Sequence, residues 1–159
     1  MTYPEPKYHG DTGGVNATFR PASTPAELSR PGGGAFHYIA RGASTGGEFG
    51  LYRVDMEPGP GGAAMHFHRS FSESFFVLSG TVQFSNGEKW FDGSAGDFVY
   101  IPVGGLHAFR NESGQPASML LLFVPGADRE GYFEGLADLG KMSAEERAEF
   151  FVRHDNNFV

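Results

Sequence analysis

The fold of this chain is decided by two segments, HFHRSFSESFFVLSG at residues 66–80 and GDFVYIPVGGLHAFRN at residues 96–111. Together they contain three histidines and one glutamate: His66, His68, His107 and Glu73. Imidazole nitrogens and a carboxylate form a ligand set that suits a transition-metal ion. The two segments therefore predict a metal site built from distant parts of one chain.

The spacing in the first segment fits ligands carried by β-strands. Side chains alternate along a strand, so His66 and His68 project from the same face, about 6.5–7 Å apart along the backbone. The four residues before Glu73 allow a tight turn into a partner strand, which would return this carboxylate beside the histidines. Gly80 stands where the next turn needs a positive φ.

The second segment places turn residues on both sides of a short strand. Residues 96–97 are typical of a turn, residues 98–101 of a strand, and residues 102–105 of a tight corner. His107 then opens another strand and supplies the fourth ligand.

Taken together, the segments resemble the paired motifs of the cupin superfamily, and the resemblance extends over residues 35–125. The defining residues present are Gly96, Pro102, Gly104, His107 and Asn111 in the second motif, and His66, His68, Glu73 and Gly80 in the first. Pro60 stands where the first motif opens with a glycine. The resemblance implies a small single-domain cupin whose metal ligands are His66, His68, Glu73 and His107. These ligands suit one divalent transition metal ion and leave open the choice among Fe, Mn, Ni, Cu and Zn.

Short strands separated by turn residues are expected throughout the cupin region. They cover residues 36–41, 49–57, 64–68, 73–79, 81–85, 88–92, 97–101, 107–111 and 117–124. Tyr52, Val54 and Met56 share one face of their strand, and Asn86-Gly87 marks a hairpin. This pattern predicts an all-β sandwich or barrel, and the resemblance specifies the double-stranded β-helix (jelly-roll) barrel, here with a short C-terminal helical segment.

Two segments flank the predicted barrel at residues 35–125. Residues 1–34 are rich in proline and glycine, which predicts an N-terminal extended arm. Residues 126–159 are expected to form C-terminal helices that pack on the barrel as outer support rather than as a lid. One helix is expected over residues 128–140. Ser143 and Glu146 form a capping box that starts a second helix, with Ala148, Phe151 and Val152 towards the barrel.

Composition limits the class of protein. The chain has 159 residues, no cysteine and a formal net charge of −7. This length suits one domain without disulfides, and the absence of a basic stripe argues against a nucleic-acid partner. The start lacks an apolar targeting segment, and no run approaches the roughly 18 apolar residues of a membrane span. We expect a cytoplasmic protein with a small-molecule substrate and no membrane partner, and the resemblance implies a homodimer.

Strand alternation also predicts the pocket wall. Phe75 shares the inward face of Glu73, and Phe109 shares that of His107, so both rings are expected to contact substrate. No arginine falls on such an inward strand position near the metal, which disfavours small, highly charged substrates such as oxalate. The pocket is therefore expected to be apolar and to favour an aromatic or polyketide-like substrate.

The chemistry expected of the site follows from its open positions. Four protein ligands on an octahedral ion leave about two positions for substrate, or for substrate and dioxygen. Glu73 is either only the fourth ligand or also the catalytic group that takes a proton from substrate. The leading hypothesis is a dioxygenase that resembles quercetin 2,3-dioxygenase and acts on an aromatic or enol-bearing small molecule. The alternatives are a cyclase or isomerase resembling cupin polyketide cyclases, in which Zn²⁺ polarises a carbonyl, and a non-catalytic metal- or ligand-binding cupin.

Overall fold

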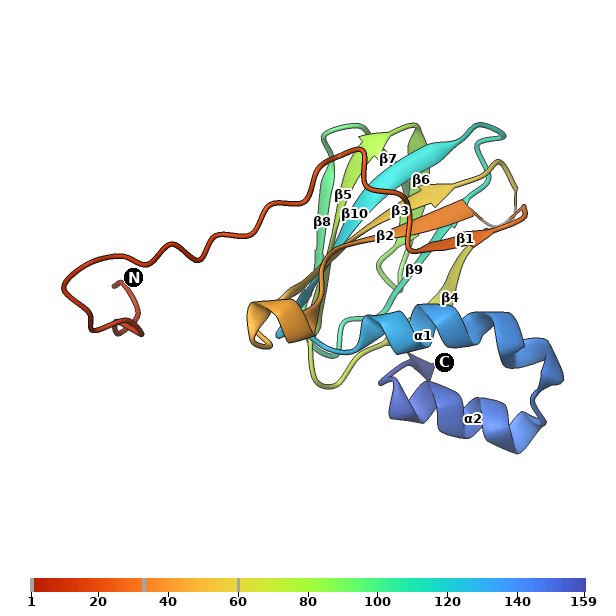
Figure 1. Cartoon of the computed structure of the whole chain (residues 1–159). Coiled ribbons are helices and arrows are strands. Elements are labelled where there is room, and N and C mark those ends of the chain that lie inside the picture. The colour runs from red at the N-terminus through yellow and green to blue at the C-terminus, as the bar shows by residue number, and fades with distance from the viewer. Residues whose placement is uncertain (1, 33, 60) are drawn as a thin grey trace.

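The computed structural model describes residues 2–32, 34–59 and 61–159, and it contains two β-sheets with helices gathered at one end (Figure 1). The six-stranded sheet has the order β1 (Leu28–Arg30), β2 (Gly34–Ala40), β3 (Gly50–Met56), β10 (Ala117–Val124), β5 (Ser72–Ser79), β8 (Phe98–Ile101). The five-stranded sheet has the order β11 (Asn157–Phe158), β4 (Gly61–Phe67), β9 (His107–Asn111), β6 (Thr81–Ser85), β7 (Trp90–Ser94). The predicted all-β jelly-roll class is confirmed. Within the described ranges, however, hydrogen bonds form two open sheets and not a closed barrel.

The core lies between the sheets because the strands alternate as predicted. In β3, Tyr52, Val54 and Met56 are buried, whereas the residues between them are partly exposed. The neighbouring strand β10 sets Leu121 opposite Tyr52 and Met119 opposite Val54. Each fully buried side chain of this size contributes about 1.5–3 kcal/mol relative to an exposed one, so this face stabilises the sandwich.

The connection from β4 to β5 differs from the prediction. The expected tight turn into a partner strand is wrong, because β4 pairs with β9 and β11 while β5 pairs with β10 and β8. Residues 68–71 instead carry the chain from one sheet to the other. Phe71 anchors this crossing: it is 3% exposed, and its ring lies 4.3 Å from that of His68. Glu73 therefore reaches the histidines across the sandwich.

Two predicted turns are confirmed by their backbone conformations. Asn86 and Gly87 lie in the loop of the β6–β7 hairpin, where Ser85 pairs with Trp90, and Gly87 has φ +91°. Gly80 joins β5 to β6 with φ +71°. A Cβ atom at Gly80 would lie 2.4 Å from the carbonyl oxygen of Pro116. Glycine is therefore required there both for its φ and for lack of space.

The N-terminal arm extends away from the sandwich in Figure 1 before the chain enters β1. Between residues 2 and 27 the chain contains no helix or strand. One hydrogen-bonded turn lies at residues 21–24, and large apolar side chains such as Tyr3 and Phe19 are exposed. At its end, Leu28–Arg30 pairs with β2. Met1, Gly33 and Pro60, the last of which replaces the opening glycine of the first motif, lie outside the described residues.

The α-helices begin after β10, as predicted. The segment expected over residues 128–140 forms α1 (Arg129–Gly135) followed by the 3₁₀ helix η2 (Leu136–Lys141). A shorter 3₁₀ helix, η1 (Gly42–Thr45), lies between β2 and β3. The predicted capping box starts α2 (Ala144–Arg153): the Glu146 N–H donates to Ser143 Oγ, and the Ser143 N–H donates to Glu146 Oε2. In the described parts of the chain, no helix has the length and apolar character to cross a membrane.

The packing of α2 differs from the prediction in detail. Its buried residue is Phe150, which stacks on Tyr132 of α1 at 5.7 Å, whereas Ala148 and Val152 are exposed. Phe133 of α1 reaches the sandwich and lies 5.3 Å from Tyr52. The helices thus pack on each other as well as on the sheets. The buried face of α2 is therefore centred on Phe150, which contacts α1, and not on Ala148 and Val152.

Candidate metal centre

Four buried side chains converge between the two sheets. His66 comes from β4, His68 from the residue after it, Glu73 from β5 and His107 from the start of β9. One potential ligand atom from each lies within 4.8 Å of the others. All four residues are at most 4% exposed. The structure therefore brings together the whole ligand set that the sequence predicted.

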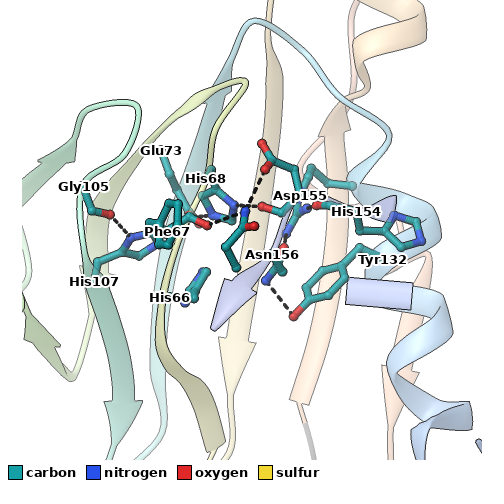
Figure 2. A network of polar contacts seen from close by, with 12 residues as sticks. His66, Phe67, His68, Glu73, Gly105, His107, Tyr132, His154, Asp155 and Asn156 are labelled. Carbon is teal, nitrogen blue, oxygen red and sulfur yellow. Dashed lines mark hydrogen bonds and ion pairs between the residues drawn. The ribbon is translucent and has the colours of Figure 1, made fainter. Parts of the chain in front are cut away.

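Strand register explains how the histidines meet. His66 and His107 are directly paired across β4 and β9, and their ring centroids lie 4.2 Å apart. His68 lies on the same face as His66, with ring centroids 4.8 Å apart. Glu73 faces them from the other sheet, as Figure 2 shows. The site therefore depends both on the register of β4 and β9 and on how the two sheets pack face to face.

Backbone carbonyl groups orient each imidazole. The Nδ1–H groups of His66, His68 and His107 donate to the carbonyl oxygens of Ala64, Asp155 and Gly105, at 2.7, 2.6 and 3.0 Å. A carbonyl only accepts, so each Nδ1 carries a proton and each Nε2 is left as the ligand atom. Partners of this kind fix the ring tautomer of metal-binding histidines.

The distances to Glu73 fit a shared cation. Glu73 Oε2 lies 2.9 Å from His107 Nε2 and 3.0 Å from His68 Nε2. Neutral Nε2 atoms and a carboxylate oxygen all present lone pairs, so at this distance a proton or a cation must lie between them. Two ligand atoms about 2.1 Å from one ion and at right angles are about 3.0 Å apart. The donor atoms therefore fit a transition metal ion.

The pKa shifts describe the protein before metal binds. Burial alone would raise the pKa of Glu73, but hydrogen bonds from His107 and His68 outweigh it and hold the pKa well below its usual range. Burial alone would lower the pKa of His107, but its hydrogen bond to Glu73 and the charge of that carboxylate raise it. Burial and the charge of His107 lower the pKa of His66 to about 4. The proton that competes with a metal therefore resides chiefly on His107.

The turn after α2 ties the C-terminus to the metal centre, and sequence reasoning did not find it. Asp155 has φ +53°, and its carbonyl oxygen accepts from His68 Nδ1 (Figure 2). Its carboxylate accepts from the N–H groups of Arg69 and Ser70 and from Ser70 Oγ. Asp and Asn tolerate positive φ at such positions, which was the available local signal. No local signal indicates a partner more than 80 residues away.

A second contact network joins this turn to α1. Arg129 Nη1 donates to the carbonyl oxygen of His154 at 2.8 Å, and Nη2 donates to Asn156 Oδ1 at 3.0 Å. Asn156 Nδ2 donates in turn to the hydroxyl oxygen of Tyr132 at 3.0 Å. Arg129 is 3% exposed. The C-terminal strand β11 completes the connection by pairing Phe158 with His66.

A cavity of about 550 Å³ opens beside His66 and Glu73. Its wall is mainly apolar and includes the aromatic rings of Phe109, Phe123, Phe133 and Phe158. Of the two predicted substrate contacts, Phe109 lines the cavity. Phe75 is 2% exposed and lies behind Phe109 and His107, with ring centroids 5.5 and 6.1 Å away. The predicted aromatic character of the pocket therefore agrees with the cavity.

Two arginines line the cavity from elements that the expectation about inward strand positions did not cover. Arg129 of α1 and Arg30 of β1 both line the cavity that contains His66 and Glu73. The prediction considered inward positions on the strands next to the ligands. These two arginines come from a helix and from the edge of a sheet, so strand alternation could not have placed them.

Comparison with known proteins identifies the central part of the chain. Residues 52–123 match the family model described as a cupin domain. This range contains all four candidate ligands and both motifs.

Two curated relatives each match about half of this chain. A mannose-1-phosphate guanylyltransferase of Salmonella muenchen is 31% identical over 77 residues, which are 48% of this chain and 16% of that protein. The alginate biosynthesis protein AlgA of Pseudomonas syringae is 33% identical over 76 residues, which are 47% of this chain and 15% of that protein. The chain thus spans about a sixth of the length of these relatives.

Solved structures share the fold over more of the chain. KdgF from Halomonas sp. has a TM-score of 0.60 and 16% identity, covering 72% of this chain and 99% of its own. The polyketide cyclase RemF from Streptomyces resistomycificus has a TM-score of 0.56 and 20% identity, covering 69% and 80%. A predicted oxalate decarboxylase from Thermotoga maritima has a TM-score of 0.54 and 17% identity, covering 58% and 80%. At these identities the likeness shows the fold alone.

Proposed function

We propose that this protein, which carries a cupin domain at residues 52–123, is a metal-dependent enzyme acting on an aromatic or enol-bearing small molecule. The observation that carries the proposal is the position of the ligand cluster: two of its four side chains, His66 and Glu73, line a cavity of about 550 Å³ whose wall includes several aromatic rings. A cavity of this size accommodates a small organic ligand. A metal held only for structure does not require such a space.

The residues that would hold one divalent transition metal ion (Fe, Mn, Ni, Cu or Zn) are His66, His68, Glu73 and His107. When bound, such an ion supplies Lewis-acid activation of a substrate oxygen and, if it is redox-active, electron transfer to dioxygen. The three imidazoles are oriented in advance by their Nδ1–H bonds to backbone carbonyls. This arrangement lowers the reorganisation needed for metal and substrate to bind.

Glu73 is the group we assign to proton transfer. Its lowered pKa keeps the carboxylate ionised throughout the physiological range in the metal-free protein, so it carries no proton when substrate arrives. A carboxylate of low pKa is a weak base, which suits the acidic hydroxyl of a phenol or enol better than that of an alcohol. We place Phe109 against the substrate ring, because Phe109 lines the cavity and contacts between aromatic rings are favourable. The assignment of Phe75 as a substrate contact stays a prediction.

Within this function, the reaction we propose first is dioxygenation of the kind carried out by quercetin 2,3-dioxygenase. It is supported by the aromatic cavity and by a ligand number that leaves room for two further ligands on an octahedral ion. The test is an oxygen electrode with metal-loaded protein and a flavonol. We expect oxygen uptake that requires metal and that falls by about 10²–10⁴-fold in Glu73→Gln, because the general base is lost.

A second candidate is a cyclase or isomerase that uses no oxygen. It is favoured by the likeness of the fold to the polyketide cyclase RemF, although at 20% identity. Substrate turnover without oxygen uptake, best supported by a Zn-loaded protein, would replace the dioxygenase with this candidate. Stoichiometric metal with no turnover of flavonols or polyketides would leave a non-catalytic metal- or ligand-binding cupin.

The predicted homodimer, the cytoplasmic location and the absence of nucleic-acid and membrane partners belong to the same proposal. The expected division into an arm at 1–34, a cupin region at 35–125 and helices at 126–159 stays a prediction as well. Sedimentation of the purified chain tests the dimer directly: a single species at 17.2 kDa would exclude it.

A further inference from the structure

Among the described residues, two buried side-chain nitrogen atoms lack hydrogen-bond partners, and both belong to arginines that line the same cavity. Over residues 2–32, 34–59 and 61–159, the buried side-chain nitrogen and oxygen atoms without a partner are the Nε atoms of Arg129 and Arg30. Both arginines line the cavity that also contains His66 and Glu73. A charged donor that is buried without an acceptor is unfavourable, so such a group calls for an explanation.

Arg129 is held rigidly with one side of its guanidinium engaged. Nη1 and Nη2 donate to His154 and Asn156, and the guanidinium carbon lies 4.3 Å from the ring centroid of Tyr132 and 5.0 Å from that of Phe123. These contacts fix the side chain at 3% exposure and leave Nε–H unused. A donor that is oriented before a ligand arrives loses little entropy when it binds.

Arg30 and Tyr132 add donors to the same wall. Arg30 Nη2 donates to the carbonyl oxygen of Phe133, which leaves its Nε–H without an acceptor. The Tyr132 hydroxyl oxygen accepts from Asn156, so its own O–H remains able to donate. Burial raises the pKa of Tyr132, which keeps this O–H protonated at neutral pH. The polar part of the wall therefore consists mainly of donors.

The charges near the cavity are not balanced. Of the carboxylates that line it, Glu73 is engaged by His68 and His107, and Glu57 is exposed. Two arginines therefore line the cavity beside a site suited to a divalent cation. The ligand chemistry that complements such a site is an anion with oxygen acceptors.

We propose that the cavity binds a substrate carrying a carboxylate, which Arg129 and Arg30 hold while the rest of the molecule lies against the aromatic wall. This inference rests on the proposed function and narrows its substrate class to aromatic or enolic carboxylates. The unused Nε–H of each arginine can donate one charge-assisted hydrogen bond to a carboxylate oxygen, and the apolar remainder of such a substrate is complementary to Phe109 and Phe123.

The test compares two probes of nearly equal shape, salicylate and salicylamide, by calorimetric titration of Zn-loaded protein. We expect salicylate to bind at least about tenfold more tightly, because a charge-assisted hydrogen bond is about twice as strong as a neutral one. In Arg129→Met this preference should disappear while zinc content stays at the wild-type level. Arg153→Met is the matched control: this arginine of α2 is exposed and does not line the cavity, so the preference should be unchanged.

Equal binding of the two probes to wild-type protein would overturn the inference, as would a preference that persists in Arg129→Met. If Arg129→Met does not fold, Arg30→Met decides, because Arg30 is only half-buried: its preference should fall several-fold, and an unchanged preference would overturn the inference. Repeating the titration on metal-free protein separates the two proposals. If the wild-type protein binds no metal when it is titrated with metal, the metal-dependent enzyme is refuted. A preference for salicylate that persists in that protein would still support the anion site.

Discussion

The strands of the sandwich and the C-terminal segment, residues 129–158, contribute to the metal centre in different ways. The strands carry three of the four ligands, and the fourth, His68, directly follows β4; one potential ligand atom from each lies within 4.8 Å of the others. The C-terminal segment carries none of the four. It supplies the carbonyl oxygen behind His68, the buried guanidinium of Arg129 and part of the cavity wall. The sequence motifs therefore predict the ligands, whereas a group that orients one of them and part of the cavity wall come from the C-terminal segment.

The largest effect is expected when a ligand is removed from the strands. In His107→Ala, bound metal should fall well below one ion per chain, because the site loses a ligand and Glu73 loses a hydrogen-bond partner. We expect a loss of affinity greater than the 10–100-fold that is typical of outer partners. Elemental analysis of protein purified without chelators measures it. His9→Ala, in the exposed arm, is the control, and full metal retention in His107→Ala would remove this residue from the ligand set.

A smaller effect is expected when the C-terminal segment is disturbed at Asp155. Asp155→Ala loses the carboxylate that binds the β4–β5 connection and disfavours the positive φ that aims the carbonyl at His68. Metal affinity should fall by about 10–100-fold, measured by competition with a chelating dye. Asp155→Gly keeps the backbone conformation and loses only the carboxylate, so its loss should be smaller.

Asp138→Ala is the matched control for this experiment, because Asp138 pairs with Lys141 on the surface. If Asp155→Ala bound metal as tightly as Asp138→Ala, the C-terminal segment would have no role in orienting the ligands. The contrast between the two regions would then reduce to the cavity wall.

Acid should weaken metal binding by protonating His107, a ligand on strand β9, and not by acting on the C-terminal segment. His107 has a raised pKa in the metal-free protein because of Glu73. The stability that this pair adds to the metal-free fold is fully present below about pH 6.5 and is lost as pH rises through the raised pKa. Metal requires neutral His107, so its affinity should fall about tenfold per pH unit below that pKa. His66, with a pKa of about 4, does not contribute in this range. Constant affinity from pH 8 to pH 6 would contradict His107 as the competing group.

The smallest effect is expected at the start of α2. Ser143→Ala removes a capping hydrogen bond to Glu146 and should lower the free energy of unfolding by about 1 kcal/mol. Denaturant titration measures this loss, and metal stoichiometry should not change. Metal loss without a change in stability would show that α2 acts on the metal centre directly, which would remove the distinction between the two regions.

Much of the strand region was predictable because its signals are local. Alternation placed Tyr52, Val54 and Met56 on the buried face, and the glycine at position 80 marked a turn that requires positive φ. The crossing at residues 68–71 was mistaken for a hairpin, because the length of a connection does not say which sheet the next strand joins. The sequence also predicts a closed barrel, whereas the described residues form two open sheets.

The sequence by itself determined the candidate ligand residues, the strand pattern and the two capping residues of α2, because each depends on neighbours within a few positions. Only the tertiary structure decided that Glu73 reaches the histidines from the opposite sheet, that Asp155 accepts from His68, and that Arg129 lines the cavity. These contacts join residues that are far apart in the chain or lie in different sheets, and Arg129 sits on a helix whose local pattern indicates only that it is amphipathic. Their geometry follows from how the sheets and helices pack together, and no short stretch of sequence encodes that packing.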